Sequence, residues 1–103
     1  MYIARWHVEA RFGHKQKVLE LMRQWEKDIG SQVGWTGDKA RLITGSIGAK
    51  EAEIQNDVEV ESLEELEKAF AKLGSAKGHA EWGREMEKYI VSGSNYWEIF
   101  RVV

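Results

Sequence analysis

The sequence predicts an α+β domain in which a four-stranded antiparallel sheet carries helices on one face. Apolar and polar side chains alternate strictly over residues 2–12, which indicates a long, half-buried strand. Periodic segments then follow in the order helix, strand, strand, helix, helix, strand. A length of 103 residues suits one domain, so we expect residues 1–103 to fold as a single unit.

The composition is that of an ordinary globular protein, with 43% hydrophobic and 31% charged residues. The net charge is −2 and basic residues are scattered, so we expect no nucleic-acid partner and no membrane partner. No apolar run approaches the roughly 20 residues that span a bilayer. Without cysteine there is no disulfide or thiolate chemistry. With no signal-peptide pattern at the start, we expect a cytoplasmic protein.

The first predicted strand, residues 2–12, has two distinct faces. Its apolar face comprises Tyr2, Ala4, Trp6, Val8, Ala10 and Phe12. Its other face carries the cations Arg5, His7 and Arg11. We expect the apolar face to pack on the helices, burying residues as far along as Phe12.

A helix is predicted after Gly13, because apolar residues recur at steps of three and four, including Val18 and Trp25. Gly30 is a typical helix stop, since glycine accepts the left-handed conformation. The polar segment 31–38 contains Trp35, which would be exposed unless it folds back onto the core.

Two strands are predicted next, over residues 41–47 and 53–61, joined by a hairpin at residues 48–51. Ser62 and Glu65 then form a capping box that opens a second helix. A third helix is expected over residues 77–91. A last strand, residues 96–103, closes the chain.

A βαββαβ chain of this length forms a ferredoxin-like sheet with its first and third strands side by side in the centre. The third strand carries acids on its polar face, at positions 57, 59 and 61. We therefore expect Arg5, His7 and Arg11 to face these acids, each opposite-charge pair contributing roughly 0.2–1 kcal/mol.

Three short segments support a family resemblance. They are residues 13–15 at the start of the first helix, residues 58–65 where the third strand meets the capping box, and residues 92–102 with the turn Ser92-Gly93 and the last strand. With these the chain resembles, over nearly its whole length, the dimeric α+β-barrel superfamily, near its NIPSNAP-like and antibiotic-biosynthesis-monooxygenase-like members. The resemblance implies a homodimer whose two sheets enclose the polar face. It does not imply one activity, because this superfamily includes oxygenases, haem-degrading enzymes and isomerases.

His79 is the sharpest candidate for chemistry. It shares a helical face with Trp82 and Met86, so it should point toward the sheet. In haem-degrading members of the superfamily a histidine on this helix binds iron, which makes His79 a candidate ligand or base. The alternative is a half-exposed histidine at the start of a helix. The enzymes also carry an asparagine on the first strand, where this chain has Trp6 or His7, and a tryptophan where it has Phe70. Two of three functional positions are thus unmatched, and we expect no cofactor, with haem as the alternative.

The aromatic residues suggest a pocket between helices and sheet. We expect Trp6, Phe70 and Trp82, together with His79 and Met86, to line an apolar pocket for a small aromatic ligand. Simple core packing is the alternative for any one of them. Trp97 is predicted at a subunit interface, where tryptophan is enriched.

The polar face of the first strand allows two interpretations. His7 could act as a general base beside a carboxylate in a barrel cavity. We favour a salt-bridged dimer interior instead. No metal site is expected, since His14 has no second ligand at metal spacing. The segment 45–50 lacks phosphate-loop spacing, and the third strand lacks the aromatic motif of RNA-recognition domains.

The sequence therefore favours a small homodimeric binding protein with an apolar ligand pocket, and leaves open whether it is an enzyme. The alternative is a cofactor-independent or haem-degrading monooxygenase.

Overall fold

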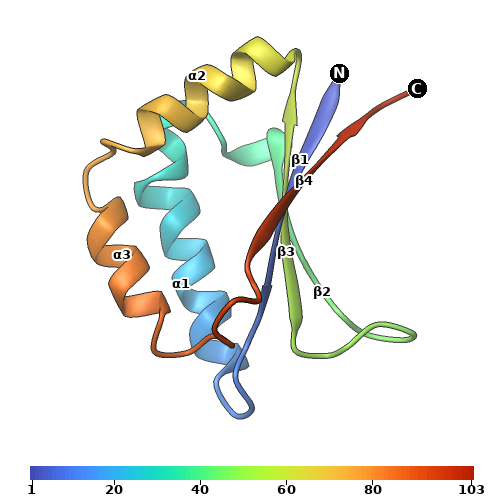
Figure 1. Ribbon diagram of the computed structural model, residues 1–103, viewed down its shortest axis with the longest axis vertical. Coiled ribbons are helices and arrows are strands. Elements are labelled where there is room, and N and C mark those ends of the chain that lie inside the picture. Colours follow the sequence, from blue (N-terminus) through green and yellow to red (C-terminus); the bar gives the residue numbers. More distant parts are fainter.

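The computed structural model describes residues 1–103 as one sheet with helices on one side (Figure 1). Its elements are β1 (Tyr2–Glu9), α1 (Lys15–Asp28), two short 3-10 turns (Gly30–Val33 and Gly37–Lys39), β2 (Ala40–Thr44), β3 (Glu53–Val60), α2 (Leu63–Leu73), α3 (His79–Met86) and β4 (Tyr96–Arg101). The strand order is β2-β3-β1-β4, and every neighbouring pair is antiparallel. This confirms the α+β, ferredoxin-like fold with β1 and β3 in the centre.

The helix-facing side of the sheet forms the core, as the alternation in β1 predicts. Ala4 and Val8 of β1, and Ile54 and Val58 of β3, are completely buried. Two clusters of buried residues lie along this side. One centres on Trp25 and Trp35, and the other on Val18 and Met86.

Trp35 folds back onto the core and is only 2% exposed. Its backbone N–H donates to the Gly30 carbonyl at 2.9 Å, which turns the chain after α1. A Cβ at Gly30 would lie 2.9 Å from the Trp35 carbonyl oxygen and 3.0 Å from the Trp25 ring. Gly30 is therefore required for close packing, and not for the left-handed helix end that the sequence suggested.

The start of α2 follows the predicted capping box. The Ser62 hydroxyl accepts a hydrogen bond from the Glu65 backbone N–H at 3.1 Å. The Glu65 carboxylate in turn accepts from the Glu61 N–H at 2.7 Å. The first bond is the predicted cap, whereas the second reaches the residue before the cap and not the Ser62 N–H of a capping box.

Several predicted ends were wrong. β1 stops at Glu9, and Phe12 lies in the turn before α1, fully exposed and not buried. β2 ends at Thr44, so Ile47 projects from the hairpin and is 99% exposed. α3 ends at Met86 because the chain turns back toward β1, where Ala10 and Ile90 form an isolated bridge. In each case the alternation or helical periodicity of the sequence continues past the end of the strand or helix, into a turn whose conformation is set by backbone contacts.

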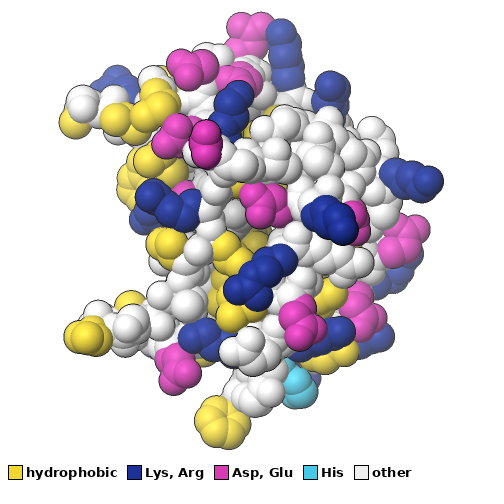
Figure 2. Space-filling view, turned by 180° about the vertical axis from the view of Figure 1, so that it is seen from behind, with side chains coloured by type: hydrophobic (Ala, Val, Ile, Leu, Met, Phe, Trp, Pro, Cys, Tyr) yellow, Lys and Arg dark blue, Asp and Glu magenta, His cyan; other side chains and the backbone are white.

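Figure 2 shows one face of the molecule, on which acidic and basic side chains are interspersed. Hydrophobic side chains project at its margins and also lie together near its centre. None of the helices has the length and apolar character needed to cross a lipid bilayer.

Candidate functional site

A cavity of about 410 Å³ lies between the helices and the sheet. Ligand sites in proteins have volumes of roughly 300–1,000 Å³, so this space suits a small molecule. The walls come from all three helices, three strands and the turn before β4; they comprise Trp6, Met22, Trp25, Asn56, Phe70, Leu73, Gly74, His79, Trp82, Gly83, Asn95 and Trp97. Phe70 and Trp97 form its open side, since each is 37% exposed.

The walls are predominantly aromatic. Trp82 lies at the centre of one group, with its ring centroid 6.2 Å from those of both Trp6 and Trp25. Its indole N–H donates to the Leu21 carbonyl at 2.7 Å, which fixes the ring against α1. Phe70 packs edge-on against Trp97 at 5.1 Å. Rings held in this way present both faces and edges to a flat ligand.

His79 is held in one orientation by α1. The Trp25 indole N–H donates to His79 Nδ1 at 3.1 Å. An indole N–H can only donate, so Nδ1 must offer its lone pair and the ring proton must lie on Nε2. The imidazole is also nearly parallel to the Trp82 ring, with 9° between their planes. His79 therefore contributes a hydrogen-bond donor to the cavity wall.

Haem does not fit this arrangement. Iron binds the lone pair of a histidine nitrogen, whereas His79 Nε2 carries the proton. No lysine or arginine lines the cavity, so nothing there pairs with the carboxylates that haem carries. Apart from haem, no group of three or more His, Cys, Asp or Glu side chains converges in a way that could hold a metal ion.

Asn56 is a polar residue of the cavity that sequence reasoning missed. It lies in the middle of β3, directly opposite Trp6 of β1, and is only 8% exposed. Every fully enclosed polar side-chain atom has a hydrogen-bond partner. The Asn56 amide forms no side-chain hydrogen bond, so its atoms must meet the open space of the cavity. Water or a ligand in the cavity can therefore hydrogen-bond to it.

The cavity brings together most of the predicted pocket residues. Trp6, Phe70, His79 and Trp82 all lie on its wall. Met86 does not, because it lies at the end of α3, over the other core cluster. Trp97 also lies on this wall. It pairs with Trp6 across the sheet, so its ring lies on the helix side, and its place at a subunit interface stays a prediction.

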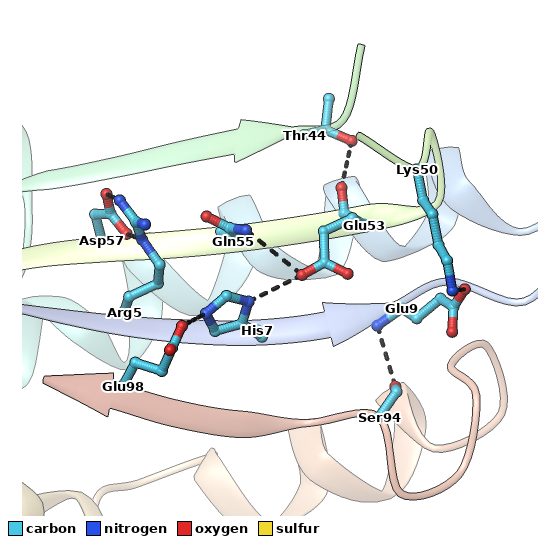
Figure 3. Close-up of polar contacts among 10 residues, drawn as sticks. All are labelled: Arg5, His7, Glu9, Thr44, Lys50, Glu53, Gln55, Asp57, Ser94 and Glu98. Atoms are coloured by element: carbon cyan, nitrogen blue, oxygen red, sulfur yellow. Dashed lines mark hydrogen bonds and ion pairs between the residues drawn. The ribbon is translucent and has the colours of Figure 1, made fainter. Parts of the chain in front are cut away.

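The opposite face of the sheet carries a network of charges (Figure 3). Arg5 donates two hydrogen bonds to Asp57, at 2.7 and 2.9 Å, across the predicted β1–β3 pair. These bonds, followed by the nearby negative charges, raise the pKa of Arg5 above its ordinary value despite partial burial. The other two predicted pairs were wrong. The antiparallel register places Gln55 opposite His7, and Arg11 lies beyond the end of β1.

His7 finds different acidic partners in this network. Its Nδ1 lies 2.9 Å from a Glu53 oxygen, and its Nε2 contacts Glu98 of β4. The ring also stacks on Tyr96, 4.2 Å away and nearly parallel. Both ring nitrogens are thus engaged by carboxylates of the chain itself, and a substrate would have to displace one of these contacts to reach the ring. The role of His7 as a general base stays a prediction.

Solved structures of other proteins share this fold. A NIPSNAP family protein from Agrobacterium tumefaciens aligns with a TM-score of 0.78 and 17% identity, over 99% of this chain and 92% of its own. A second nipsnap family protein of that species, described as of unknown function, aligns with a TM-score of 0.78 and 15% identity, over 100% of this chain and 88% of its own. An antibiotic biosynthesis monooxygenase aligns with a TM-score of 0.70 and 11% identity, over 100% of this chain and 99% of its own. No protein-family model matches the sequence, and no curated protein matches it significantly.

Proposed function

We propose that this protein is a homodimeric small-molecule-binding protein that holds a flat, largely apolar ligand in the cavity between its helices and sheet. The observation that carries the proposal is the make-up of the wall, in which aromatic rings from five elements surround the Asn56 amide and the His79 donor. Small-molecule sites typically combine an apolar lining with a few polar groups that orient the ligand. Stacking on indole rings favours a planar ligand.

The outer face of the sheet supports the homodimer. Phe100 of β4 is 44% exposed there, and Arg5 lies over its ring at 5.4 Å. Ile43 of β2 and Tyr96 of β4 are likewise 38% and 52% exposed. Arg5, His7 and Asp57 between them already have partners within the chain, so a second copy would cover apolar surface without leaving these three groups unpaired.

Ligand binding is tested with the uncharged fluorescent probe N-phenylnaphthylamine. We expect its emission to rise on binding and tryptophan emission to fall, because four indoles line the cavity. Gly83→Leu provides the blocking variant. Gly83 lies four residues after His79 on α3, and a Cβ there meets nothing within 4 Å. The longer side chain should occupy the cavity and abolish the signal.

Gly83→Ala is the matched control, since one methyl group leaves most of the cavity open. It should bind the probe as the wild type does. Equal binding by Gly83→Leu and the wild type would show that the probe lies elsewhere, and no binding by any of the three would contradict the proposal.

The dimer is tested by sedimentation, which should report about twice the chain mass of 11.9 kDa. Phe100→Glu should yield monomers, because it buries a carboxylate at the proposed interface. Phe12→Glu is the control, since Phe12 is fully exposed in a turn away from the sheet face. Dissociation by both variants, or by neither, would argue against this interface.

A cofactor-independent monooxygenase is the second candidate. It is favoured by the fixed His79 donor, which could stabilise negative charge on a bound oxygen atom. The antibiotic biosynthesis monooxygenase of the same fold is consistent with it. An oxygen electrode tests this candidate: a bound phenolic probe should cause oxygen uptake that His79→Ala abolishes.

A further inference from the structure

We propose that Asn56 determines which ligand the cavity accepts, by pairing its carboxamide with a lactam-type edge, in which an N–H lies beside a C=O on a planar ring. This inference rests on the proposed function, since it names the ligand class for the same cavity.

Asn56 is a polar residue at a position of β3 where the alternation predicts an apolar one. The other helix-facing residues of β3 are Ile54, Val58 and Val60, each at most 2% exposed. An asparagine among them weakens both strand formation and core packing. Where a sequence departs from its own pattern in this way, the residue commonly serves function and not folding.

The amide has no partner within the protein. It is 92% buried, and it opens only onto the cavity. In the free protein, water can hydrogen-bond to it there. A ligand that displaces this water gains affinity only if it replaces the same hydrogen bonds.

The chemistry of a carboxamide defines the complementary group. Its oxygen accepts and its nitrogen donates, side by side in one plane. The matching edge has a donor and an acceptor at the same spacing, as a lactam does. No charged side chain lines the cavity, so the ligand should be uncharged. The Nε2–H of His79 is a second donor, which suits a carbonyl-bearing ring.

The experiment compares three small probes by titration calorimetry. Carbostyril is a flat bicyclic lactam. N-methylcarbostyril has the same carbonyl but no N–H, and a C-methylcarbostyril controls for the added methyl group. We expect the wild type to bind carbostyril and the C-methyl probe at least about tenfold more tightly than the N-methyl probe. Equal affinity for all three would overturn the inference, whatever the variants do.

Two variants locate the effect. Asn56→Leu has a similar volume and no amide, so it should bind all three probes equally and unfold at the same or a higher temperature. A purely structural amide would instead lower the unfolding temperature. Gln55→Leu changes the next residue, on the opposite face of β3, and should keep the preference. A preference that survives in Asn56→Leu would also overturn the inference.

The inference and the proposed function fail in different ways. If N-phenylnaphthylamine binds in the cavity but the lactam probes show no preference, only the role of Asn56 is refuted. If neither the apolar probe nor the lactams bind, the proposed function itself fails.

Discussion

Replacing Arg5 with methionine tests how completely the sheet buries its charges. The Asp57 side chain is 5% exposed and receives both guanidinium hydrogen bonds of Arg5, whose own side chain is 29% exposed. Arg5→Met would leave a buried carboxylate with only Arg41 nearby, at 3.7 Å. Breaking a fully buried pair costs about 3–5 kcal/mol. Because Arg5 is partly solvated, we expect a loss of about 2–3 kcal/mol.

The assay is urea unfolding followed by tryptophan fluorescence, with the protein concentration fixed because dimerisation would shift the midpoint. The expected loss corresponds to a fall in unfolding temperature of roughly 10–20 °C for a domain of this size. Arg41→Met is the matched control. It removes a cation that is 68% exposed beside the same carboxylate, and should cost less than about 1 kcal/mol. If the two variants lose equal stability, Asp57 is more solvated than the structure indicates and the reasoning fails.

Three further outcomes are expected. Gly83→Ala should raise the free energy of unfolding by about 0.5–1 kcal/mol, because alanine loses less backbone entropy than glycine in a helix interior. Gly45→Ala should lower the free energy of unfolding, since its Cβ would lie 1.7 Å from the Lys50 carbonyl oxygen. Thermal unfolding of both variants tests this difference. Ser62→Ala should cost about 1 kcal/mol in urea unfolding, as it removes the cap of α2. Haemin titration should give no shifted Soret band that depends on His79, and a band lost in His79→Ala would refute the assignment of its proton to Nε2.

The central part of the fold could be predicted because its signals are local and strong. Alternation in β1 and β3 gave the buried faces, and the Arg5–Asp57 pair followed from opposite charges on adjacent strands. The ends could not be predicted, since turns depend on backbone contacts between distant residues. Phe12 continues the alternation of β1, yet the chain turns there to begin α1. The exact register of β1 against β3 could not be predicted either, so the acids expected to face His7 were wrong.

The cavity could be predicted in part. Helical spacing placed His79 and Trp82 toward the sheet, and both line the cavity. The contact between Trp25 and His79 joins two helices 54 residues apart, and no pattern in the sequence indicates it. The sequence does indicate that Asn56 is unusual, because it is the one amide on the apolar face of β3. The alternation of β3 predicts an apolar side chain at this position, and Asn56 is the exception to it.

Asn56 and Asp57 are adjacent in β3 and point to opposite sides of the sheet, and the difference between them separates two roles. Asp57 is buried and paired by Arg5, so its charge is satisfied within one chain. That face needs no ligand, and its remaining exposed groups include apolar ones such as Phe100, which suit association. Asn56 is equally buried but unpaired. Its amide has no partner within the chain, so water or a ligand in the cavity must supply its hydrogen bonds. This difference is why we propose ligand recognition on the helix side of the sheet and subunit contact on the other side.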